Sequence, residues 1–204
     1  MIVLFSMGIQ VIMLLISIVI HEVAHGVAAW RLGDPTAKSE GRLTLNPVVH
    51  MDLVGSLLVP GLSIIVGSPV LIGWAKPVPI NPRFFRNPSR DMMVVAIAGP
   101  LSNLCLVGIA IILFNLGVGD GVGYWLIRFI QLNTVLAVFN LFPIPPLDGS
   151  RILSHFLPFQ GREVLNRIEP YGFFIVLLLA YMGILSTILT KVLVPVWGVI
   201  EKLL

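Results

Sequence analysis

The chain has 204 residues, of which 57% are hydrophobic and 11% are charged. Soluble domains carry about 25% charged residues, so this composition excludes a water-soluble protein and predicts a single membrane-embedded domain over residues 1–204. The net charge of +3 is too small to indicate a nucleic-acid partner. The single cysteine, Cys105, excludes an internal disulfide and a thiolate metal site.

Charge-poor apolar runs predict the membrane spans, because about 20 apolar residues cross the hydrocarbon core. The first run lacks Lys and Arg over its first twenty residues, so we expect a retained span and not a cleaved signal peptide. The final piece, 192–204, is too short to span and is expected either to lie at the interface or to pack on the bundle. The sequence predicts an α-helical membrane protein, a bundle of about four to six transmembrane helices. The expected spans are 4–30, 53–75, 92–119, 129–147 with an apolar lead-in from Gly121, and 170–190.

The second run is unusual because it contains Pro60-Gly61 and Ser68-Pro69. Such residues fit a kinked span or a segment that enters and leaves on one side of the membrane. The positive-inside rule favours a re-entrant segment at 53–75, because the loops on both sides of it are basic. A kinked span remains the alternative. The basic loops, expected in the cytoplasm, are 31–52, 76–91 and 148–169, whereas 118–123 carries only Asp120.

Short membrane-associated β-strands are expected in the loops that flank this second run. Residues 42–45 alternate between polar and apolar side chains, as in a strand. Residues 76–81 (KPVPIN) are expected to be extended. Because Pro77 and Pro79 lack an N–H, this segment can donate hydrogen bonds along one edge only, which predicts an edge strand.

The first apolar run contains the pentapeptide His21-Glu22-Val23-Ala24-His25. Two imidazoles four residues apart lie on one face of a helix, where they can share a zinc ion. The glutamate of an HExxH motif is the usual general base. Ionisable groups at membrane depth are costly and are functional candidates. A chance HExxH is the alternative, but it would leave the buried carboxylate and both imidazoles without partners.

A catalytic zinc has three protein ligands, so a third is required. Asp148 is the strongest candidate, because it follows three prolines in four residues at the inner end of the fourth run. The prolines are expected to stop the helix and extend the chain, and Gly149 to permit a tight turn. A turn or capping aspartate is the ordinary alternative. The candidates considered are His50, Asp52, Asp120, Asp148 and His155.

Three motifs together resemble the site-2 protease family of intramembrane zinc metalloproteases, peptidase family M50. They are HEVAH, AGPLSN at 98–103 and NLFPIPPLDG at 140–149. The loops GRLTLNPVVHMD and GWAKPVPINP resemble those of its small prokaryotic members, which lack PDZ and CBS domains. The resemblance covers about residues 18–152.

The resemblance implies one Zn²⁺ per chain, held by His21, His25 and Asp148, with Glu22 as the general base. It also implies that Asn140 binds the substrate backbone or the oxyanion. The implied enzyme is an endopeptidase in the lipid bilayer that hydrolyses peptide bonds within or near transmembrane segments of membrane proteins. Under the predicted topology its active site faces the cytoplasm.

Several polar residues can have either a functional or a structural role. Asn140 can also cap or cross-link helices, and Asn103 is expected to satisfy backbone groups freed at Gly99-Pro100. His50 and Asp52 either line the active-site cleft and orient a ligand or cap the chain at the interface. His155 is expected at the surface.

The strand at 42–45 is the candidate edge for an unwound substrate, since a transmembrane helix must open before its carbonyls can be attacked. A metal-ion transporter is the alternative function. It would usually need ionisable groups on several spans, but 92–119 and 170–190 have no charged residue. A catalytically inactive binding protein would not need Glu22.

Overall fold

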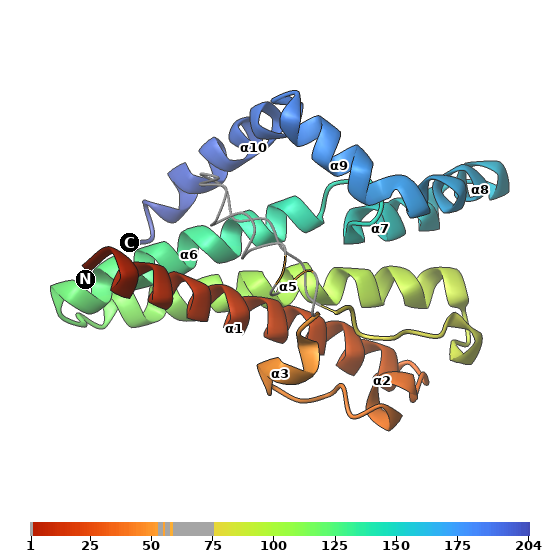
Figure 1. The fold of residues 1–204 in the computed structure, drawn as a ribbon, viewed down its shortest axis with the longest axis horizontal. Helices are drawn as coiled ribbons and strands as arrows, with labels where there is room; N and C mark the ends of the chain where they lie inside the picture. Colours follow the sequence, from red (N-terminus) through yellow and green to blue (C-terminus); the bar gives the residue numbers. More distant parts are fainter. Residues whose placement is uncertain (1, 53–54, 56–57, 59–75) are drawn as a thin grey trace. The chain divides into compact units, whose positions relative to one another are not determined.

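The computed structural model describes residues 2–52, 55, 58 and 76–204. The chain divides into two compact units, Met1–Arg86 and Asn87–Leu204, each with its own packing. The described residues are mainly helical, as Figure 1 shows, which confirms the predicted helical class. The predicted re-entrant segment, 53–75, lies outside the described residues apart from two positions.

One long helix, α1 (Ile2–Arg31), dominates the first unit (Figure 1). Two residues after the end of this helix, Gly33 has a positive φ of +108°. Asp34 N–H then donates to the Ala29 carbonyl at 2.9 Å, which satisfies one of the last carbonyls of the helix. Two short helices pack against α1. They are α2 (Thr36–Ser39) and α3 (Pro47–His50), and the 3₁₀ helix η2 (Pro82–Phe84) completes the described part of the unit.

Neither predicted strand is present in the described chain. Residues 42–46 form bends and irregular backbone, and 76–81 have no strand assignment. The physical reason is that side chains and the carbonyl of the last residue of α3 bind the main chain of 76–81. Arg42 Nη2 donates to the Lys76 and Pro77 carbonyls at 2.7 and 3.3 Å. Lys76 N–H donates to the His50 carbonyl at 2.9 Å.

The second unit begins with two long helices, α5 (Pro88–Asn115) and α6 (Asp120–Asn140). The start of α5 is capped reciprocally, since Asn87 Oδ1 accepts from Arg90 N–H and Asp91 Oδ2 accepts from Asn87 N–H. The two helices pack together, and Asn103 Nδ2 of α5 donates to Asn133 Oδ1 of α6 at 2.9 Å. This cross-link between two buried amides was not predicted.

Shorter helices complete the second unit. Helix α7 packs against α5, while α10 packs against α6 and α9. One core cluster joins Val107, Ala110, Ile130 and Ile200. The elements are α7 (Asp148–Phe156), α8 (Phe159–Ile168), η3 (Glu169–Tyr171), α9 (Gly172–Tyr181) and α10 (Ile184–Ile200).

Four helical runs in the described residues are long and apolar enough to cross a membrane: Phe5–Arg31, Pro88–Asn115, Gly121–Asn140 and Phe159–Tyr181. The predicted span 129–147, with its lead-in from Gly121, was wrong only at its C-terminal end, because its helix already ends at Asn140, before the first proline. The predicted span 170–190 was wrong in extent, because Gly183 (φ +73°) ends α9 within it. Much of the tail 192–204 belongs to α10.

Candidate metal centre and catalytic residues

The two histidines of HEVAH lie one turn apart in the C-terminal half of α1. Their side chains are 7% and 6% exposed, and their Nε2 atoms are 3.0 Å apart. A tetrahedral zinc with Zn–N bonds of about 2.0–2.1 Å holds two nitrogens about 3.3 Å apart. The imidazole nitrogens of His21 and His25 therefore fit a shared zinc to within a few tenths of an ångström.

Glu22 lies on the neighbouring face of α1, and the structure gives it a main-chain partner. Its Oε2 accepts a hydrogen bond from the Val78 N–H at 2.8 Å. Val78 is the residue between the two prolines of KPVPIN, so its N–H has proline nitrogens, which cannot donate, on either side. The HExxH carboxylate is thus fixed by a segment 56 residues further along the chain.

Asp148 is the first residue of α7, immediately after the proline-rich connection 141–147. This connection is a series of turns, so the predicted extended chain was wrong. Ile144 N–H donates to the Phe142 carbonyl and Leu147 N–H to the Ile144 carbonyl, at 2.8 and 2.9 Å. The peptide bond between Pro145 and Pro146, inside the second turn, is cis.

Gly149 has a different role from the predicted one. It lies inside α7, and it is not among the left-handed glycines of the described chain. A Cβ at Gly149 would lie 2.1 Å from the Leu141 carbonyl oxygen, so only glycine permits this close approach. Gly172 of α9 is similar, because a Cβ there would lie 2.3 Å from the Pro145 carbonyl oxygen. Two glycines therefore fix the connection that precedes Asp148.

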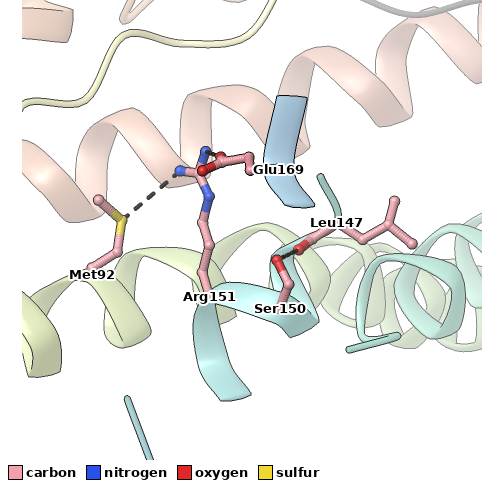
Figure 2. Close-up of polar contacts among 5 residues, drawn as sticks. All are labelled: Met92, Leu147, Ser150, Arg151 and Glu169. Atoms are coloured by element: carbon pink, nitrogen blue, oxygen red, sulfur yellow. Dashed lines mark hydrogen bonds and ion pairs between the residues drawn. The ribbon is translucent and has the colours of Figure 1, made fainter. Parts of the chain in front are cut away.

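The start of α7 is also anchored by polar contacts, which Figure 2 shows. Ser150 Oγ donates to the Leu147 carbonyl at 2.7 Å. Arg151 contacts Met92 of α5 through Nη1 and Sδ at 3.9 Å. Its Nη2 lies 3.6 Å from a carboxylate oxygen of Glu169 in η3. These contacts attach the helix that begins at Asp148 to both α5 and η3.

Asn140, the expected oxyanion ligand, is the last residue of α6. Its Nδ2 donates to the Leu136 carbonyl of the same helix at 3.0 Å. This bond uses one of the two amide hydrogens, and the second hydrogen is the one that an external acceptor would use.

The remaining candidates make structural contacts. His50 is 1% exposed, and its Nε2 lies 2.8 Å from the Thr44 carbonyl oxygen. Asp52 Oδ1 accepts from Gly55 N–H at 2.7 Å. His155 is half-buried, and its Nδ1 lies 3.0 Å from Ser89 Oγ. The side chain of Asp120 lies outside the described atoms.

Asp34 and Arg42 are buried charged residues that sequence reasoning missed. Arg42 is 3% and Asp34 0% exposed. In the sequence, Arg42 contributed only to the basic charge of loop 31–52, which was used to predict the membrane topology. Asp34 precedes Pro35-Thr36, an N-cap pattern that could have drawn attention to it. Both side chains bind the main chain of 76–81.

Comparisons with known proteins agree with these features. The family profile described as Peptidase family M50 matches residues 118–183. The chain is 41% identical over 179 residues to "Putative zinc metalloprotease YwhC" of Bacillus subtilis, a match covering 83% of this chain and 78% of that protein. It is 32% identical over 175 residues to "Putative zinc metalloprotease Rip2" of Mycolicibacterium smegmatis, covering 81% of this chain and 63% of that one. No solved structure gives a significant match.

This chain belongs to peptidase family M50, the site-2 protease family. It is a metalloprotease, and its relatives imply zinc as the metal. The four membrane-length helices found among the described residues indicate a multi-pass membrane protein. Membership of a peptidase family does not favour the metal-ion transporter that the sequence left open.

Proposed function

We propose that this protein is an intramembrane endopeptidase that hydrolyses peptide bonds within or near transmembrane segments of membrane proteins. The observation that carries the proposal is the position of HEVAH inside α1, a helix of membrane-spanning length and composition. A protease whose base and histidines lie in such a helix acts on chains that share the bilayer. We place the active site towards the cytoplasmic side, as the basic loops indicate.

The proposed metal site is one Zn²⁺ per chain, held by His21, His25 and Asp148. The spacing of the two imidazole nitrogens supports the first two ligands. The fixed position of Asp148 at the start of α7 supports the third, because metal ligands must be positioned accurately. We also propose that residues 1–204 act as one protease domain. Bound zinc supplies Lewis acidity, polarising a peptide carbonyl and acidifying water.

The protein groups divide the remaining work between them. Glu22 takes a proton from the attacking water and delivers it to the amine that leaves. Asn140 donates the second hydrogen of Nδ2 to the oxyanion that develops on the substrate carbonyl. Both assignments follow from donor and acceptor chemistry: a carboxylate accepts protons, and an amide nitrogen only donates.

A substrate helix must unwind before cleavage, and its freed main-chain groups then need new partners. We propose that 42–45 pairs with the unwound stretch and becomes a strand only when that partner is present. An apolar groove of about 310 Å³ lies beside this segment, and Leu45 is 66% exposed. The groove would take the apolar side chains of the substrate. Its lining residues are Ile12, Leu15, Ile16, Val19, Ile20, Leu45 and Pro47.

The test uses purified enzyme reconstituted with a single-span membrane protein as substrate. Glu22→Gln should retain zinc and lower the cleavage rate by about 100-fold or more, the usual scale for loss of a general base. His21→Ala should lose zinc and activity together, and a chelator should inhibit the wild type. Normal cleavage by Glu22→Gln would remove this residue from the mechanism. Cleavage that persists in the fully zinc-free protein would overturn the proposed function.

A further inference from the structure

Val78, the hydrogen-bond partner of Glu22, packs against α1 at Gly26, where the missing side chain leaves a notch in the helix surface. Glu22 and Gly26 are four residues apart and share a helix face. A Cβ at Gly26 would lie 3.0 Å from Val78 Cγ1 and 2.6 Å from Leu43 Cδ2. Because Gly26 has no side chain, Val78 can pack directly on the helix. One turn away, its N–H then reaches the carboxylate of Glu22.

The segment that carries Val78 is held on both sides of that residue. Arg42 binds the carbonyls before it, and Asp34 Oδ2 accepts from the Asn81 N–H after it at 2.6 Å. Burying an arginine and an aspartate is costly unless their polar atoms are bound. Here Arg42 Nη2 and Asp34 Oδ2 bind the main chain of 76–81, whereas Arg42 Nε is buried with no hydrogen-bond partner among the described residues. Pro77 and Pro79 further restrict the backbone, because each ring fixes φ.

We propose that the Val78 backbone N–H positions the Glu22 carboxylate, and that the Gly26 notch and the two buried charges keep this N–H in place. The inference rests on the proposed role of Glu22 as general base. With Oε2 engaged by the N–H, Oε1 is the oxygen that receives the proton from water. A glutamate side chain has three rotatable bonds, and this hydrogen bond restricts them before substrate arrives.

The first test measures hydrogen exchange of the Val78 amide and needs no activity. Glu22→Ala removes the acceptor, so exchange of one amide in 76–81 should accelerate, whereas Glu22→Gln retains an acceptor oxygen and should leave exchange slow. Asp34→Ala is the matched control and should release a different amide, that of Asn81. Since two of the six residues are prolines, the amides to resolve are only those of Lys76, Val78, Ile80 and Asn81. Unchanged exchange in Glu22→Ala would overturn the inference.

The second test measures cleavage. Gly26→Ala should displace Val78 and lower kcat by about 10- to 100-fold, the scale of a misplaced catalytic group, with zinc content unchanged. Gly8→Ala, on the same helix with nothing within 4 Å of the new Cβ, is the control. Adding both Leu43→Ala and Val78→Ala, which shorten the two side chains nearest to the new Cβ and keep the Val78 N–H, should restore kcat. A kcat for Gly26→Ala equal to that of the control would contradict the inference.

A double-substitution cycle separates positioning from general damage. In the Glu22→Gln background, Gly26→Ala should have little further effect, because the group it displaces acts through the base. A full additional loss in that background would indicate general damage and overturn the inference. Failure of the proposed function gives a different pattern, in which Glu22→Gln cleaves normally whatever the exchange of the Val78 amide.

Discussion

The Gly149→Ala substitution tests whether the close approach of Gly149 to the Leu141 carbonyl fixes the position of Asp148. The new Cβ would lie 2.1 Å from the Leu141 carbonyl oxygen, while ordinary contact begins at 3.4 Å, so the backbone must separate by about 1.3 Å. Both colliding groups belong to regular or tightly turned backbone, which cannot rotate away as a side chain can. Asp148 is the neighbouring residue, so it should move with Gly149.

The magnitude follows from the tolerance of metal sites. Metal–ligand distances must lie within about 0.2 Å of their ideal values, so a shift near 1 Å removes a ligand. Changes to groups that only orient ligands weaken metal binding by about 10- to 100-fold. We therefore expect zinc affinity to fall at least about 100-fold, which corresponds to about 2.8 kcal/mol. Overpacking should also lower the stability of the fold by about 1–3 kcal/mol.

The assay titrates zinc against a competing chelator in detergent and records the thermal unfolding midpoint with and without metal. Gly108→Ala is the control in the same unit, because nothing lies within 4 Å of its new Cβ. Asp148→Ala shows how far zinc affinity falls when the proposed third ligand is removed completely. Normal zinc affinity in Gly149→Ala together with weak binding in Asp148→Ala would refute the steric reasoning. Normal affinity in both would refute the ligand assignment itself.

Two further outcomes are expected. Asn103→Leu should lower the free energy of unfolding in detergent by about 1–2 kcal/mol, because it removes the donor to the buried Asn133. The double variant Asn103→Leu/Asn133→Leu should recover part of this loss. A loss in the double variant equal to or greater than that in Asn103→Leu would contradict this account. Single cysteines at Ser39 and Phe84, in a background without the native cysteine, should both resist an impermeant thiol reagent on intact cells, since both basic loops are expected in the cytoplasm. Labelling at Phe84 but not at Ser39 would show that 53–75 crosses the membrane.

Features that depend only on residues close together in the chain could be predicted from the sequence. Composition alone predicted membrane helices, because a span needs only enough apolar residues in succession. The spacing of His21 and His25 placed both imidazoles on one face, since helix geometry is set by residues three and four apart. The prolines after Asn140 ended α6, because each lacks a donor and disfavours helix in the residue before it.

The predictions that failed depended on partners elsewhere in the chain. Alternation at 42–45 is a local preference, but a strand forms only where a neighbouring segment has free donors and acceptors. Here the neighbouring main chain of 76–81 is bound by other groups. Gly149 has a plausible turn role in sequence, whereas its actual constraint is the carbonyl of Leu141, which only the fold places against it.

The sequence by itself indicated which residues are candidates to bind zinc and to accept a proton, because side-chain chemistry and helical spacing are properties of short segments. Only the tertiary structure decided what holds Glu22. Its hydrogen bond to Val78 joins residues 56 positions apart. The contact exists because Gly26 leaves room on α1 and two buried charges fix the approaching backbone. No local pattern encodes such a pairing, since it is selected by packing between segments that meet only when the chain folds.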